Sequence, residues 1–152
     1  MGPDLLKELM DWIDVAAEFE WDGSWRDIYV LDATLDDWRR TLDALRDLEP
    51  PPSFYEAGEP ALLPLRPQAI FDRREETSFL LTLTVEGVRF NCHFFDDAEI
   101  EFDIDPREVQ GQRELDVLRH FMELLARSTG KKAILTHENT KGAIIAAAAP
   151  PV

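Results

Sequence analysis

Residues 99–105 alternate strictly between carboxylate and apolar side chains and read Glu-Ile-Glu-Phe-Asp-Ile-Asp. Successive side chains of a β-strand point to opposite faces of a sheet, so this alternation predicts a strand with one apolar and one acidic face. We expect Ile100, Phe102 and Ile104 to point into a core. The opposite face then carries Glu99, Glu101, Asp103 and Asp105.

Two more strands precede this one and predict a three-stranded antiparallel meander. Residues 78–85 and 88–95 are rich in β-branched and aromatic side chains, and the two-residue Glu86-Gly87 turn separates them. This turn and a three-residue loop over 96–98 set the register of the meander. The expected polar rows across it are Thr84-Arg89-Asp105, Thr82-Asn91-Asp103 and Leu80-His93-Glu101.

The other face of the meander is apolar and needs a cover, which amphipathic helices can supply. Apolar side chains recur at helical spacing over residues 3–18, 35–48 and 113–128, and Thr34 is a suitable N-cap for the second of these helices. The expected fold is therefore α+β, with further strands over 26–31, 132–136 and 143–146. We expect one domain over residues 1–146 and a flexible tail over 147–152.

The charge of the chain limits the classes of partner that we expect it to bind. The formal net charge is -15 at pH 7, a balance that repels nucleic acid and anionic membranes and attracts cationic proteins. The longest apolar stretch, residues 143–151, is too short to span a bilayer. The single Cys92 cannot form an internal disulfide, and the sequence opens without a positively charged leader, so we expect a cytoplasmic protein. The oligomeric state stays open.

Two histidines suggest chemistry without specifying it. His93, beside Glu101 and near Asp103, has the donor types of a metal or acid–base site, and His137 follows a predicted strand. A half-exposed histidine such as His93, paired with a cross-strand acid, more often has a structural role, and the sequence fixes no partner for His137. Phosphate-cradling glycine loops, paired-cysteine zinc motifs and nucleophile elbows do not occur in the sequence. We therefore assign no catalytic residue, metal ligand or cofactor, and keep an enzyme based on His93 or His137 as an alternative.

The acidic strand is the candidate surface for binding a basic protein partner. Its contact stripe would be Glu99, Glu101, Asp103 and Asp105, with Asp96 and Asp97 at the rim. Trp25 and Trp38 would serve as aromatic anchors if they are exposed. A solvated face that only keeps the protein soluble would show the same pattern.

Several segments resemble small, uncharacterised bacterial proteins of the kind found as immunity partners of polymorphic toxins. These are 25–30 (WRDIYV), 36–38 (DDW), 91–95 (NCHFF), 99–106 and 135–139 (LTHEN). The resemblance implies a non-enzymatic, cytoplasmic, acidic inhibitor that occludes a basic toxin, and it carries over no functional residues. An acidic secretion chaperone, a homodimer that holds an extended effector segment, is the second interpretation.

Overall fold

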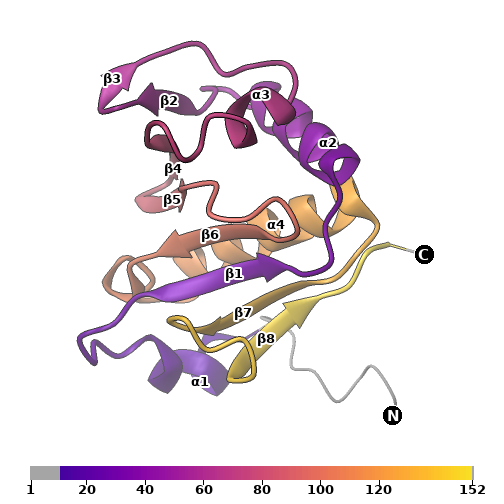
Figure 1. The fold of residues 1–152 in the computed structure, drawn as a ribbon. Helices are drawn as coiled ribbons and strands as arrows, with labels where there is room; N and C mark the ends of the chain where they lie inside the picture. Colours follow the sequence, from indigo (N-terminus) through magenta and orange to yellow (C-terminus); the bar gives the residue numbers. More distant parts are fainter. Residues whose placement is uncertain (1–10, 152) are drawn as a thin grey trace.

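A single antiparallel sheet is the frame of the molecule. The structure, a computed structural model, describes residues 11–151, and its eight strands follow the order β3-β2-β4-β5-β6-β1-β7-β8 (Figure 1). The strands are β1 (Arg26–Val30), β2 (Ser53–Glu56), β3 (Glu59–Pro60), β4 (Phe79–Val85), β5 (Val88–Cys92), β6 (Ile100–Ile104), β7 (Ala133–His137) and β8 (Ile144–Ala148). The predicted meander is β4-β5-β6, and β1 lies against its last strand.

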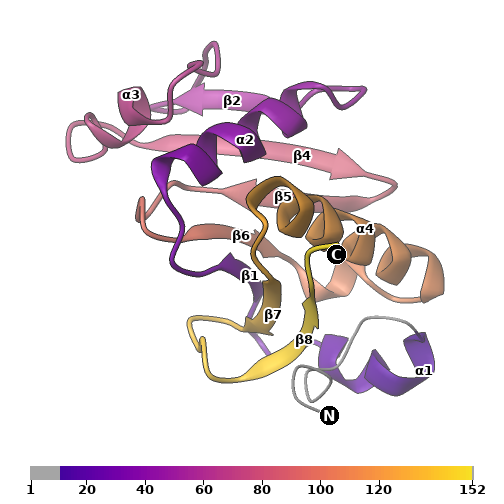
Figure 2. The same ribbon diagram turned by 90° about the vertical axis from the view of Figure 1, so that its right-hand side faces the viewer.

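The helices pack on one face of this sheet, as the apolar side of the meander requires. Figure 2 shows α2 and α4 together on that face. The helices are α1 (Trp12–Val15), α2 (Leu35–Arg46), α3 (Gln68–Phe71) and α4 (Gln112–Thr129), with 3-10 turns η2 (Ala16–Phe19) and η3 (Pro106–Glu108). Their apolar side chains join those of the sheet in one buried cluster. The α+β fold expected from the sequence is confirmed.

The apolar wall of the meander is also confirmed. Ile100, Phe102 and Ile104 are fully buried, and Phe90 stacks on Phe121 of α4 with ring centroids 3.9 Å apart. The expected register holds where the ladder pairs residues, since Thr82 lies opposite Asn91, and Asn91 opposite Asp103. The carboxylates of β6 consequently point to the face that the helices leave open.

The second strand of the meander is shorter than predicted. It ends at Cys92 rather than at residue 95, because Phe94 has a φ of 57°. Positive φ is rare for a bulky side chain and stops regular pairing. This conformation buries Phe94 against Trp38, with ring centroids 5.4 Å apart, and leaves Phe95 61% exposed on the other side.

Both chain ends differ from the prediction. Of the helix expected over 3–18, residues 3–10 lie outside the described part of the chain. The remainder is α1 followed by η2; α1 begins at Trp12, where the Gln112 side chain accepts the backbone N–H at 2.7 Å, and Val15 leaves the helical region. At the other end, β8 continues to Ala148, which pairs with Ala133. Residues 147 and 148 therefore belong to the sheet and not to a tail.

Helices α2 and α4 differ from their predicted ranges by one or two residues at their ends. The N-cap of α2 is confirmed, because the Thr34 hydroxyl accepts the N–H of Asp37 and the Asp37 carboxylate accepts that of Thr34. Within residues 11–151, none of the helices has both the length and the apolar character needed to cross a membrane.

Candidate functional site

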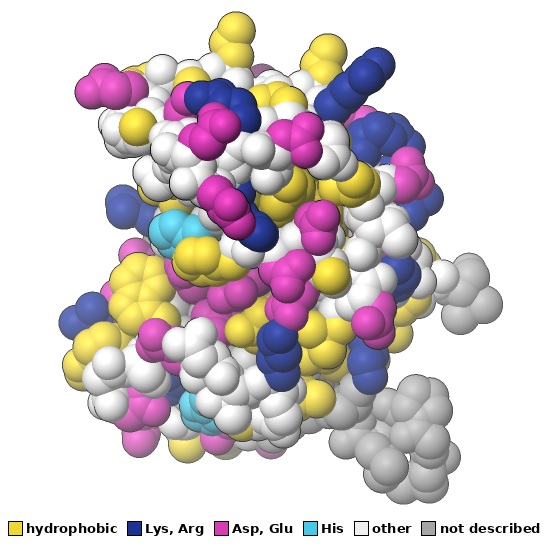
Figure 3. All heavy atoms as spheres, viewed as in Figure 1, with side chains coloured by type: hydrophobic (Ala, Val, Ile, Leu, Met, Phe, Trp, Pro, Cys, Tyr) yellow, Lys and Arg dark blue, Asp and Glu magenta, His cyan; other side chains and the backbone are white. Residues whose placement is uncertain are grey.

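A hollow of about 510 Å³ lies on the open face of the sheet, over β5, β6 and β1. Four of its lining residues carry carboxylates. Among the described residues, its lining includes no Lys or Arg. Figure 3 shows acidic side chains gathered in the middle of this face beside hydrophobic ones. We call this feature the acidic hollow; it is lined by Trp25, Asp27, Leu80, Asn91, His93, Phe95, Glu101, Asp103, Glu138 and Asn139.

A hydrogen-bonded row across the sheet sets the floor of the acidic hollow. The Thr82 hydroxyl donates to Asn91 Oδ1 at 2.9 Å, and Asn91 Nδ2 donates to Asp103 Oδ1 at 3.1 Å. The strand register places Asp27 directly opposite Asp103 on the other side. Because like charges directly opposite each other repel, this pair costs stability and calls for an explanation beyond packing.

Asp27 is the most deeply placed of these acids, with 3% of its surface exposed. Its Oδ2 accepts the backbone N–H of Asn139 at 2.7 Å and the hydroxyl of Tyr29 at 3.2 Å. Burial raises the pKa of Asp27, and the charges of Asp103 and Glu138 raise it further, against the effect of these hydrogen bonds.

Glu101 lies in an electrostatic setting that disfavours its charged form. Burial, followed by the charges of Asp27, Glu99 and Asp103, raises its pKa to about 7, while Lys141 acts in the opposite direction. The Lys141 ammonium group forms an ion pair with Glu99 and lies over the ring of Tyr29. The negative charge of the hollow therefore changes near neutral pH.

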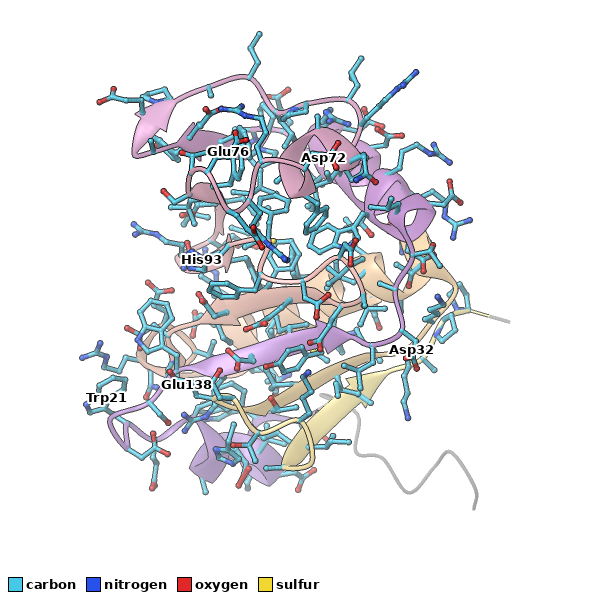
Figure 4. The ribbon with its side chains drawn as sticks, viewed as in Figure 1. Trp21, Asp32, Asp72, Glu76, His93 and Glu138 are labelled. Atoms are coloured by element: carbon cyan, nitrogen blue, oxygen red, sulfur yellow. The ribbon has the colours of Figure 1, made fainter. Side chains whose placement is uncertain are left out.

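His93 closes one side of the acidic hollow. Its Nε2 lies 3.5 Å from Asp103 Oδ2, and this contact raises the pKa of His93. Its ring stacks on exposed Phe95 with centroids 5.2 Å apart. In Figure 4 the labelled His93 and Glu138 lie on either side of β6 and β1, where they flank the carboxylates. The expected contact of His93 with Glu101 is replaced by the one with Asp103.

Trp25 forms part of the opposite side, and the residues around it are held by a buried arginine. The Arg26 guanidinium is 1% exposed, donates to the backbone oxygens of Glu18, Glu20, Ser24 and Trp25, and pairs with Asp22 at 3.2 Å. The backbone N–H of Trp25 donates to Glu138 Oε1 at 2.7 Å. The aromatic side chain thus has a rigid support.

The predicted partner-binding residues divide into four groups. Trp25, Glu101 and Asp103 line the acidic hollow. Glu99 and Asp105 lie on β6's borders but are neutralised by Lys141 and Arg107, and exposed Asp96 and Asp97 belong to the loop before β6. The prediction for Trp38 is wrong: it is 1% exposed in the core, where its indole N–H donates to the Asp97 carbonyl oxygen at 2.9 Å.

Sequence reasoning missed Asp27, Glu138, Asn139 and Phe95 as parts of one site. The strand over 26–30 and the loop after β7 join the hollow only because β1 inserts between β6 and β7. Nothing in a single sequence specifies that strand order. The alternation Arg26-Asp27-Ile28-Tyr29 gave the available signal, since it places Asp27 and Tyr29 on the same face.

The remaining candidates for chemistry lie elsewhere. His137 Nε2 is 3.2 Å from Glu18 Oε2, outside the lining of the acidic hollow. Cys92 is fully buried, and burial raises the pKa of its thiol. Among residues 11–151, no cluster of three or more His, Cys, Asp or Glu side chains has an arrangement suited to a metal ion.

Comparisons with protein-family models, with curated proteins and with solved structures give no match for this chain.

Proposed function

We propose that this protein is a non-enzymatic interaction module that binds a basic protein partner through the acidic hollow, in the way an immunity-type inhibitor occludes a basic toxin. The observation that carries the proposal is the convergence of four carboxylates on a concave surface whose lining includes no Lys or Arg among the described residues. A cationic side chain is the complementary ligand for such a surface.

The energetics of the hollow support the same proposal. Asp27 and Asp103 lie directly opposite each other on the neighbouring strands β1 and β6, and the pKa values of Asp27 and Glu101 are raised. Carboxyl groups with raised pKa values are typical of functional sites, because their charged forms add no stability to the fold. A bound Lys or Arg would relieve the repulsion, and the net charge of -15 would speed the encounter.

A short peptide of alternating Arg and Gly residues, titrated into the isotope-labelled protein, tests the proposal by NMR. We expect shift changes centred on Trp25, Asn91 and Asp103, and binding that weakens as salt rises. Glu101→Lys should weaken this binding about tenfold or more, because it reverses a charge inside the hollow. The same variant should fold at least as stably, since its new cation lies among carboxylates.

The matched control is Glu75→Lys, which makes the same change of net charge at an exposed residue outside the hollow. We expect it to change the affinity by less than about twofold. Equal effects of the two substitutions, or shift changes spread evenly over the acidic surface, would show that only the overall charge attracts the peptide, and the proposal would be wrong.

A further inference from the structure

The acidic hollow is one end of a longer depression. A second hollow of about 820 Å³ lies over β2, β4 and β5, and Leu80 and Asn91 line both. A third, of about 350 Å³, shares Leu80 and His93 with the acidic hollow and Tyr55 with the second. Half-buried Leu80 therefore borders all three, and we call their union the trough.

The far end of the trough differs in chemistry from the acidic end. Its walls include the apolar surfaces of Leu48, Pro50, Pro51, Tyr55, Leu80 and Val85. Its lining carries charges of both signs, Arg89 with Glu49 and Glu86, and Glu86 is already paired with Arg113 at 3.0 Å. The expected Arg89–Asp105 pair does not form, because Asp105 binds Arg107.

We propose that the trough holds an extended segment of the basic partner, with a Lys or Arg side chain in the acidic hollow and a large apolar side chain at the far end. Charge complementarity favours a cationic side chain in the acidic hollow, and the apolar walls favour a large apolar side chain at the far end. This inference rests on the proposed function and specifies the part of the partner that is recognised.

The sheet also sets the spacing of the two side chains. The strand order puts β4 two strands from β6 and three from β1. With about 4.8 Å between neighbouring strands, the two ends lie roughly 10 to 14 Å apart. An extended segment rises about 3.3 Å per residue and turns alternate side chains to one side. The cationic and apolar residues should therefore stand about four residues apart.

A panel of capped Gly/Ser peptides tests this spacing. One carries Arg and Phe four residues apart, in either order along the chain; the others carry the pair as adjacent residues, Arg alone, or Phe alone. We expect the spaced peptide to bind at least about tenfold tighter than the adjacent pair or Arg alone, because only it reaches both ends. Phe alone should bind weakest.

Two variants separate the ends of the trough. Tyr55→Ser, at a residue that lines the far end and not the acidic hollow, should reduce the affinity for the spaced peptide to that for Arg alone, while leaving the latter unchanged. Pro51→Ser, also outside the acidic hollow, gives the same test if Tyr55→Ser does not fold. The control is Leu62→Ser, at a leucine that is 93% exposed outside the trough. We expect this control to leave every affinity as it is.

The outcomes distinguish the two proposals. If the spaced peptide binds no tighter than Arg alone, or if Tyr55→Ser and Pro51→Ser change nothing, the extended-segment inference is wrong while the basic-partner proposal stands. If Glu101→Lys leaves the binding of Arg alone unchanged, or if Arg alone does not bind, the basic-partner proposal itself is wrong.

Discussion

At the scale of the residue, Glu101 shows how the acidic hollow and the stability of the fold oppose each other. Its pKa is raised by burial and by neighbouring carboxylates, and no hydrogen bond contributes to the shift. The charged groups around it are Asp27 on β1, Glu99 and Asp103 on β6, and Lys141 in the loop between β7 and β8. Its charge is therefore unfavourable in the folded protein, whereas a shape-matched amide should fit without penalty.

Glu101→Gln should stabilise the protein at high pH and not at low pH. The folded-state pKa of about 7 lies above the ordinary value of 4.5, so the folded protein binds more protons and loses stability as pH rises from about 4.5 to 7. We expect the variant to match the wild type near pH 4.5 and to exceed it near pH 8 by about 1 to 2 kcal/mol, after allowance for solvent screening.

Urea unfolding at both pH values measures this difference. Glu75→Gln, at an exposed carboxylate outside the hollow, is the control and should be close to neutral throughout. A Glu101→Gln effect that is the same at both pH values would show that the glutamate charge is not the cause.

At the scale of the element, the segment between η2 and β1 depends on a single side chain. Arg26 lies on β1, yet its guanidinium donates back to the carbonyl oxygens of Glu18, Glu20 and Ser24. Its partner Asp22 also accepts from Ser24, and these hydrogen bonds lower the pKa of Asp22 to about 2. The planar fork of an arginine satisfies several acceptors at once, which a lysine cannot do.

Arg26→Lys should therefore destabilise the protein by about 2 to 4 kcal/mol, because buried carbonyl oxygens lose their donors. Arg39→Lys is the control: Arg39 pairs with Asp36 and Asp43 on the surface of α2, where the same replacement should cost less than about 0.5 kcal/mol. Urea unfolding gives both values, and NMR of the Trp25 indole should report broadening only in Arg26→Lys. Similar losses in the two variants would contradict a special role for Arg26.

At the scale of the whole molecule, local pattern predicts more of this fold than of its site. The alternation in 99–105 and the Glu86-Gly87 turn predicted the meander, its register at Thr82, Asn91 and Asp103, and its buried face. Each of these follows from spacing along one stretch of chain. The end of β5 at Cys92 could not be predicted this way, because the positive φ of Phe94 depends on the core that surrounds its ring.

The acidic hollow depends on contacts between distant segments. Asp27, Asp103 and Glu138 meet because β1 lies between β6 and β7, a choice made by the packing of the complete sheet. The two acids that sequence reasoning placed at the ends of the stripe, Glu99 and Asp105, are the ones with cationic partners, Lys141 and Arg107. The sign of the surface was predictable from composition, but the position of its uncompensated charge was not.

The pH dependence of partner binding follows from the whole set of groups in the hollow. As pH falls from about 8 to 5.5, Glu101 takes up a proton and His93, whose pKa is raised by Asp103, becomes positive. Both changes oppose a cationic ligand, so the affinity for the alternating Arg/Gly peptide should fall about fivefold or more over this range. Conversely, peptide binding near pH 7 should release protons, because a cation beside Glu101 lowers its pKa.

Titrations in two buffers of different ionisation enthalpy measure this proton release directly. Glu101→Gln should bind more weakly than the wild type at about pH 8, converge with it at about pH 5.5, and release fewer protons; combining it with His93→Gln should leave the affinity nearly flat with pH. An affinity that rises as pH falls would separate peptide binding from the carboxylates of β1 and β6, and a proton release that persists in full in the double variant would show that the titrating group is neither Glu101 nor His93.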